Sequence, residues 1–183
     1  GMVGGARGLA AAAGEGGPQM RGIAAAMGQV VPEMSVGDLK GGANHILIAG
    51  PREDGGTWIH YEWPAGGTGA SHGTDGSNAV RSYNEGDFNS IQSVETVESQ
   101  YPLRVERCEI REGACGDGAS RGGFGLRRDV RILGEAAMLS VLSEKNVIPP
   151  YGVAGGGNGA ANRFVVLRDG EVVQPSDVPG KVS

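Results

Sequence analysis

With 183 residues and a formal net charge of −5, the chain has the size of one ordinary domain. The charge argues against a nucleic-acid partner, because affinity for phosphate backbones depends on clustered excess Lys and Arg. No apolar run approaches the roughly 20 residues that a membrane-spanning helix needs, so we expect a cytoplasmic protein without a membrane partner.

Glycine is unusually frequent, with 35 residues that follow no three-residue period, which excludes a collagen-like helix. Such a density produces either disorder or short strands joined by many turns. Apolar runs in the second half favour the strands. Residues 1–17 are almost all Gly and Ala, and we expect them to be a mobile N-terminus in which Gly1 is a tag remnant. Residues 18–183 are expected to form a single β-rich domain.

A helix is predicted near the N-terminus, over residues 18–31. Apolar side chains recur there at spacings of three and four residues, which is typical of an amphipathic helix. Pro18 suits the first turn and Pro32 ends the helix.

Two apolar segments, residues 45–50 and 57–63, flank the turn-rich "PREDGG" and predict a hairpin. In the second segment, alternation places Trp58, His60 and Glu62 on one face.

Further strands are predicted in the second half, over residues 103–110, 125–133 and 136–146. A slip of phase near Arg107 suggests a β-bulge. Residues 163–174 predict another hairpin, with Asp169-Gly170 at its turn.

The remaining segments are loops or ambiguous. Residues 91–102 fit either a strand or a short helix, and residues 65–90 and 147–162 are long glycine-rich loops. About seven strands result. The predicted fold class is mainly β (α+β): mostly antiparallel strands in a sandwich or barrel-like domain, with one N-terminal helix.

Chemical candidates are few. The glycines of "RGGFGLRRDVRIL" (residues 121–133) resemble a phosphate cradle, but such a cradle needs a helix behind it and a strand pattern follows here. We therefore expect a tight turn that leads into a strand. His72 and Asp75 share the first long loop and are the candidate ligands if a metal binds, although we assign no metal to this chain. Glu95 and Glu98 fit either an acid/base pair or a solvated face.

Five phrases in the same order carry a resemblance to a known family. They are "YEWPAGGTGASHGTDG", "FNSIQSVETVESQYPLRVERCEIRE", "GDGASRGGFGLRRDVRIL", "IPPYGVAGGGNGAANR" and "PGKVS". Together they resemble the C-terminal part of the B-type subunit of the hydantoinase B/oxoprolinase family, over roughly residues 58–183. In place of the family's usual "DSGG", residues 113–116 are "GACG".

The resemblance implies ATP-dependent hydrolysis of cyclic amides such as 5-oxoproline and hydantoins, or the related ATP-dependent carboxylation of ketones. It implies two partners, an A-type nucleotide-binding subunit and the missing N-terminal part of the B-type subunit. ATP and a divalent metal are expected in the complete complex and no cofactor in this chain, so we expect the isolated chain to be inactive. The alternative is a non-catalytic assembly module that self-associates through exposed aromatic residues such as Trp58, Trp63 and Tyr151.

Candidate site residues follow from the loops and from the resemblance. The catalytic candidates are Asp75, Glu95 and Arg121, which match positions of the family's motifs, and His72, which shares the loop of Asp75. The candidates for loop or substrate-side binding are Gly66, Gly67, Gly69, Asn89, Gly122, Gly123 and Gly125.

Overall fold

The computed structural model describes residues 35–38, 44–80 and 92–173, with scattered positions between 22 and 33. In chain order the elements are β1 (His45–Pro51), β2 (Thr57–Glu62), α3 (Val94–Gln100), β3 (Leu103–Arg111), β4 (Gly125–Ile132), β5 (Met138–Leu142), β6 (Leu167–Arg168) and β7 (Glu171–Val172). All strand pairs among them are antiparallel. The predicted mainly β class is confirmed.

The predicted N-terminal helix is confirmed where the structure describes it. Residues 22, 23, 26, 27, 29 and 30 are helical, and the N–H of Val31 donates to the carbonyl of Met27 at 2.8 Å. Ile23, Met27 and Val30 are exposed, so these apolar side chains do not enter the core. The predicted mobile segment, residues 1–17, lies outside the described residues.

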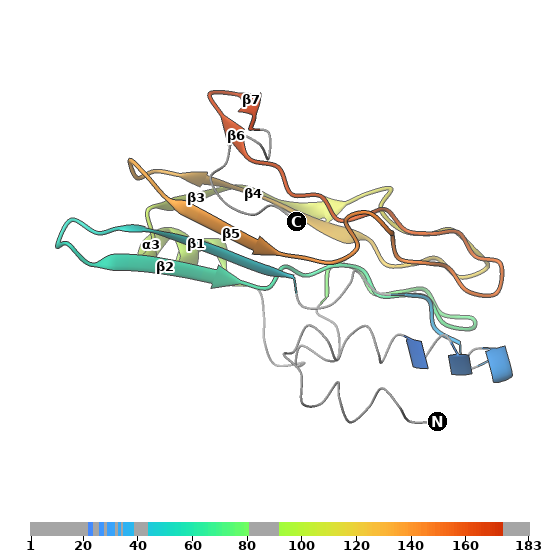
Figure 1. The fold of residues 1–183 in the computed structure, drawn as a ribbon. Helices are drawn as coiled ribbons and strands as arrows, with labels where there is room; N and C mark the ends of the chain where they lie inside the picture. Colours follow the sequence, from blue (N-terminus) through green and yellow to red (C-terminus); the bar gives the residue numbers. More distant parts are fainter. Residues whose placement is uncertain are drawn as a thin grey trace.

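A three-stranded sheet has the order β2-β1-β5 (Figure 1). The β1–β2 hairpin is confirmed, with Gly50 opposite Trp58 and Ile48 opposite His60. Gly55 turns the chain with a φ of 82°, which suits glycine because it lacks a Cβ. On the other side of β1, β5 pairs antiparallel over its whole length.

The second sheet pairs β3 with β4, and α3 leads into it. The hydroxyl of Ser93 caps α3 by accepting the N–H of Thr96 at 3.2 Å, which resolves the ambiguous segment as a helix. A register shift between Val105 and Arg107 confirms the predicted bulge.

The side-chain core lies where these two sheets and α3 meet. Ile48, Trp58, Val97 and Leu103 are buried together there, one residue each from β1, β2, α3 and β3. Each large apolar side chain buried in this way contributes about 1.5–3 kcal/mol. Because Trp58 is buried, the expectation that it is exposed and promotes self-association is wrong.

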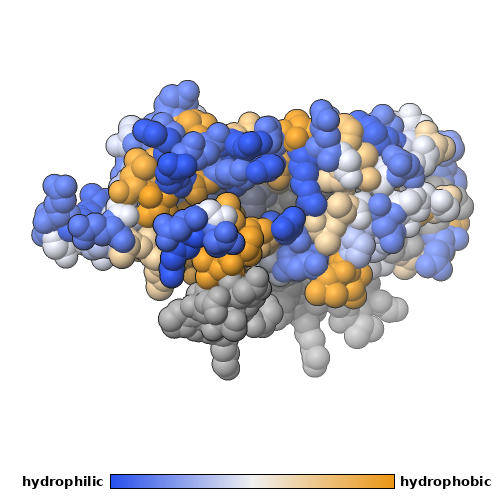
Figure 2. Space-filling view, turned by 90° about the horizontal axis from the view of Figure 1, so that it is seen from above, coloured by the Kyte–Doolittle hydropathy of each residue, from blue (hydrophilic) through white to orange (hydrophobic). Residues whose placement is uncertain are grey.

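The side of the three-stranded sheet that ends in β5 is less well covered. Seen from above, the molecule shows separate hydrophobic patches among hydrophilic residues (Figure 2). In Figure 1 the small β6–β7 hairpin projects above β3 and β4. Its turn is the predicted Asp169-Gly170 pair, with φ values of 54° and 85°.

Beyond the sheets, the two long glycine loops run beside other extended segments. We call this region the glycine bundle; it comprises residues 65–80, 114–125 and 150–160, with residues 37 and 38 beside them. Backbone hydrogen bonds cross between its segments, including Gly123 N–H to Thr68 O (2.8 Å), Gly157 N–H to Asp117 O (2.7 Å) and Gly37 N–H to Ala70 O (2.8 Å). Two loops that are distant in sequence therefore form one structure.

Close contact between backbones explains the glycines. A Cβ added to Gly67 would lie 1.9 Å from the carbonyl oxygen of Gly123, and one added to Gly69 would lie 1.8 Å from that of Gly37. These separations are far below van der Waals contact, so any side chain would force the segments apart. The bundle is thus packed through its main chain.

The predicted tight turn at residues 121–124 is wrong. These residues adopt no turn, and neither Gly122 nor Gly123 has a positive φ. They run extended through the bundle and lead directly into β4 at Gly125, so the predicted strand is confirmed. Glycine is required at Gly123 because a Cβ there would lie 1.9 Å from the carbonyl oxygen of Ser77.

In the described part of the chain, no helix combines the length and apolar character needed to cross a membrane.

Candidate functional site

Arg121 and Asp75 lie on two different segments of the glycine bundle, residues 114–125 and 65–80, and contact each other. The backbone N–H of Arg121 donates to Asp75 Oδ1 at 2.7 Å, and its guanidinium Nε lies 3.9 Å from Asp75 Oδ2. The guanidinium also donates to the carbonyl of Gly122 and lies over the ring of Phe124, 4.3 Å from its centroid. These contacts orient Arg121 at a partly exposed position.

Asn78 completes this junction. Its Oδ1 accepts the backbone N–H of Phe124 at 2.9 Å and lies 3.4 Å from the Arg121 guanidinium. A cation held by a carboxylate, an amide and a ring face is suited to binding an anionic group or a polarised carbonyl.

His72 lies apart from any cluster. It is exposed in a turn closed by reciprocal backbone hydrogen bonds between Ser71 and Thr74. Among the residues that the structure describes, no three His, Cys, Asp or Glu side chains gather as a metal site would require. The described residues therefore supply no third ligand for a metal at His72 and Asp75.

The two glutamates of α3 differ in their contacts. Glu95 is exposed in the first turn of α3. The Oε1 of Glu98 accepts the backbone N–H of Val105 at 2.9 Å and so connects α3 to β3. Asn89, another candidate, lies outside the described residues.

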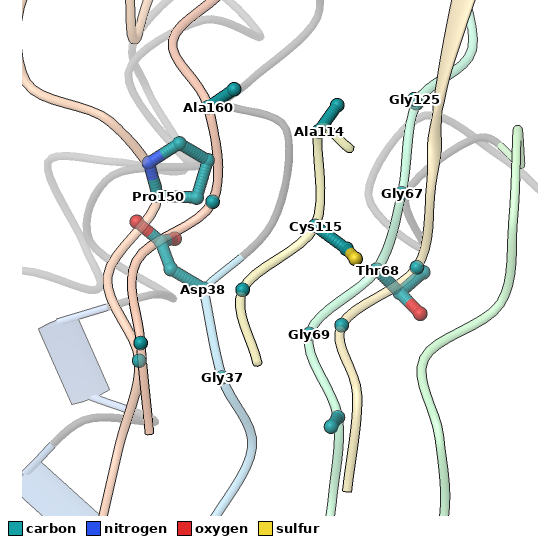
Figure 3. Close-up of a pocket in the computed structure, with 18 of the residues that line it drawn as sticks. Gly37, Asp38, Gly67, Thr68, Gly69, Ala114, Cys115, Gly125, Pro150 and Ala160 are labelled. Carbon is teal, nitrogen blue, oxygen red and sulfur yellow. The ribbon is translucent and has the colours of Figure 1, made fainter. Parts of the chain in front are cut away.

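A cavity of about 130 Å³ opens within the glycine bundle. Such a volume can hold several water molecules or a small ligand group. Figure 3 shows the segments of Gly37, Gly67, Cys115 and Pro150 around this space. Every described glycine that the family resemblance marks for binding lines it: Gly66, Gly67, Gly69, Gly122, Gly123 and Gly125.

Few ionisable side chains reach the cavity. Asp38 lines it and is paired with Lys145, whose ammonium lies 5.4 Å from the centre of the Tyr151 ring. Arg111 also lines the cavity, and its guanidinium donates to the carbonyl of Ala161 at 2.9 Å. Asp117 lines the cavity as well. The rest of the lining is mainly main chain and small side chains, which can bind through N–H and C=O groups.

Sequence reasoning missed a buried charged group between the two sheets, which we call the inter-sheet cluster: His60 and Glu62 of β2 and Arg128 of β4. Glu62 Oε2 lies 3.2 Å from His60 Nε2 and 3.4 Å from Arg128 Nε, and the three side chains are only 2%, 5% and 8% exposed for His60, Glu62 and Arg128, respectively. The ring of Tyr101 covers His60, with centroids 5.1 Å apart.

Several buried atoms of the cluster have no hydrogen-bond partner among the described residues. They are His60 Nδ1, Glu62 Oε1 and Arg128 Nε, and the same holds for Gln92 Oε1. The signal for the cluster was present in the sequence, because alternation placed His60 and Glu62 on the face of Trp58. It was not recognised that this face is the buried one.

The sequence profile described as Hydantoinase B/oxoprolinase matches residues 16–182, almost the whole chain. The chain belongs to the hydantoinase B/oxoprolinase family. The match reaches further toward the N-terminus than the resemblance over residues 58–183, and it includes the predicted helix.

Curated relatives support the family. A 5-oxoprolinase of Dictyostelium discoideum is 36% identical over 110 residues, which is 60% of this chain and 8% of the relative. The B-type subunit of a putative D-/L-hydantoinase from Pseudomonas is 30% identical over 157 residues, 84% of this chain and 25% of the relative. The chain thus spans a quarter or less of these family members.

A solved structure shares the fold. A chain of nucleotide-free acetone carboxylase superposes with a TM-score of 0.58 at 20% identity, covering 68% of this chain and 17% of the other. The fold of this hydantoinase B family member therefore occurs inside a much longer polypeptide.

Proposed function

We propose that this chain is a module of a B-type subunit that contributes to ATP-dependent hydrolysis of cyclic amides, such as 5-oxoproline or hydantoins, together with an A-type partner. The family match over residues 16–182 carries the proposal. Relatives named as 5-oxoprolinase and as the B-type subunit of a hydantoinase support this substrate class.

Within such a complex, the glycine bundle would be a rigid scaffold that presents Arg121. The Asp75 carboxylate and the Phe124 ring already orient its guanidinium, so little side-chain entropy would be lost on binding. A cyclic amide develops negative charge on its carbonyl oxygen when water attacks, and a positioned cation stabilises such charge. The role of Arg121 is therefore electrostatic.

The remaining parts of the reaction belong to the partners. ATP and a divalent metal would be bound in the complete complex, by the A-type subunit and the rest of the B-type subunit. We expect no turnover by this chain alone. Amidase activity of the isolated chain would contradict this division of labour.

The test replaces the matched segment of the Pseudomonas B-type hydantoinase subunit with this chain and co-expresses the hybrid with its A-type subunit. ADP release and ring opening are measured with 5-oxoproline, with hydantoin and, for the ketone-carboxylase alternative, with acetone and bicarbonate. We expect cyclic-amide turnover, reduced about 100-fold by Arg121→Ala. Arg104→Ala, an exposed arginine on β3, is the matched control and should retain activity.

Two results would redirect the proposal. Turnover of acetone alone would assign the chain to the carboxylase alternative. An assembled hybrid complex that turns over normally after Arg121→Ala would favour a non-catalytic assembly module.

A further inference from the structure

Strand β5 is an apolar edge strand. In the described part of the sheet its neighbour is β1, and all five of its residues are exposed. Leu139 and Val141, on the face shared with the core, are 42% and 37% exposed, and Met138 and Leu142, on the outer face, are 62% and 66% exposed. Ser140 is its one polar residue.

The opposite edge of the same sheet is covered on its inner face. Trp58, His60 and Glu62 of β2 are all buried under α3 and the β3–β4 sheet. The second sheet does not bury β5 in the same way. Among the residues that the structure describes, other elements therefore bury the inner face of the β2 edge but leave the β5 edge exposed.

Edge strands of soluble proteins are normally protected by charged side chains, proline, bulges or a covering segment. The sequence of β5, "MLSVL", contains neither a charge nor a proline, and it pairs with β1 without a register shift. The other fully exposed strands, β6 and β7, are only two residues long and each contains a charged residue. β5 thus has the character of a strand that is covered in the working protein.

We infer that the rest of a B-type subunit covers β5 by adding an extended segment with apolar side chains on both faces. This inference rests on the proposed function. The relative chain lengths favour this occupant, because this chain spans 25% of the hydantoinase relative, 8% of the 5-oxoprolinase and 17% of the acetone carboxylase chain. In those proteins at least three quarters of the polypeptide lies outside the matched segment and is covalently attached to it.

Covalent attachment favours this occupant over a second copy of the chain. A segment on the same polypeptide is present at millimolar effective concentration, whereas a second copy is limited by the protein concentration. Main-chain pairing at β5 would give the affinity, and pockets for alternate side chains would give the specificity.

The test mixes this chain with the Pseudomonas B-type hydantoinase subunit from which the matched segment has been deleted. The variant Met138→Lys/Leu142→Lys adds two charges to the outer face of β5. The matched control, Ile59→Lys/Tyr61→Lys, adds two charges to the outer face of β2, where both residues are also exposed. Calorimetry measures affinity, hydrogen exchange of residues 138–142 reports the strand, and thermal unfolding verifies that both variants fold.

We expect the β5 variant to bind about tenfold or more weakly and the β2 control to bind within about twofold of the unmodified chain. Exchange at residues 138–142 should slow on binding. Equal effects of the two variants, or no binding of the unmodified chain, would overturn the inference. A dimer of the chain alone that the β5 variant dissociates would also overturn it, in favour of a second copy.

The outcomes separate this inference from the proposed function. If the hybrid complex turns over cyclic amides but the two charges added to β5 do not weaken binding, the proposed docking surface is wrong and the proposed function stands. If the charges added to β5 weaken binding but no assembled complex has activity, the proposed docking surface stands and the proposed function is wrong.

Discussion

Two regions of this molecule are held together by different means. Between the sheets, Trp58, Val97 and Leu103 form a core of interlocking side chains. In the glycine bundle, backbone segments contact one another directly and hydrogen-bond across, with no large side chain between them. A high glycine content can therefore specify a packed structure, because glycine has no side chain to keep the hydrogen-bonding groups of neighbouring backbone segments apart.

The two regions should respond to opposite kinds of substitution. The side-chain core is sensitive to loss of volume, since a cavity remains. The bundle is sensitive to gain of volume, since even a methyl group meets a carbonyl.

Loss of volume is tested by Trp58→Ala. The buried indole contacts α3 and β3, so we expect the free energy of unfolding to fall by about 4 kcal/mol. Urea denaturation followed by circular dichroism measures this. Trp63→Ala, at the half-buried end of the same hairpin, is the control, and an equal loss there would argue against a core centred on Trp58.

Loss of a buried charge is tested by Arg128→Met. The substitution leaves the Glu62 carboxylate buried beside His60 without its guanidinium, and we expect a loss of about 3 kcal/mol. The double variant Arg128→Met/Glu62→Leu should recover part of that stability, because no uncompensated carboxylate remains. A double variant less stable than Arg128→Met would show that the pair is not the source of the loss.

Gain of volume is tested by Gly123→Ala. Its Cβ would lie 1.9 Å from the carbonyl oxygen of Ser77, so the bundle must open, at a cost of about 2 kcal/mol. Gly134→Ala is the control, because the nearest atom, Pro102 Cγ, is 3.9 Å from its added Cβ. Equal stability of the two variants would mean that the bundle is not closely packed.

The smallest effect concerns pH, at an exposed pair outside both regions. The hydrogen bond from Arg127 lowers the pKa of Asp129 below 3.8, an effect that partial desolvation opposes. A lowered folded-state pKa stabilises the protein above the unfolded pKa, and this contribution disappears as pH falls through the folded value. Asp129→Asn should therefore lower the free energy of unfolding slightly at pH 7, and this difference should shrink as the pH falls below 3.8, as urea titrations over that pH range would show.

Most of the sheet elements could be predicted from local pattern. The alternation in residues 57–63, the Asp169-Gly170 turn and the slip near Arg107 are each properties of a few neighbouring residues. The segment that includes α3 remained ambiguous, because serine, the residue at the N-cap position 93, is common both at helix starts and in turns. Its burial against β3 selects the helix.

The site was predicted less completely. Asp75 and Arg121 were both candidates, but nothing in the sequence places residues 46 positions apart in contact. His60 and Glu62 were assigned correctly to one face, yet polar residues are normally expected on the solvent side. The partner that buries them, Arg128, comes from the other sheet.

Motifs and short-range conformational preference were sufficient to predict the family, most strand segments and the hairpin turns, but not the path of residues 121–124. The contacts of the folded chain were needed to show why glycine is required in the bundle and which face of β2 is buried. The physical reason is that both outcomes depend on contacts between distant segments. At Gly123, the space for a side chain is occupied by a backbone carbonyl from a loop more than 40 residues away.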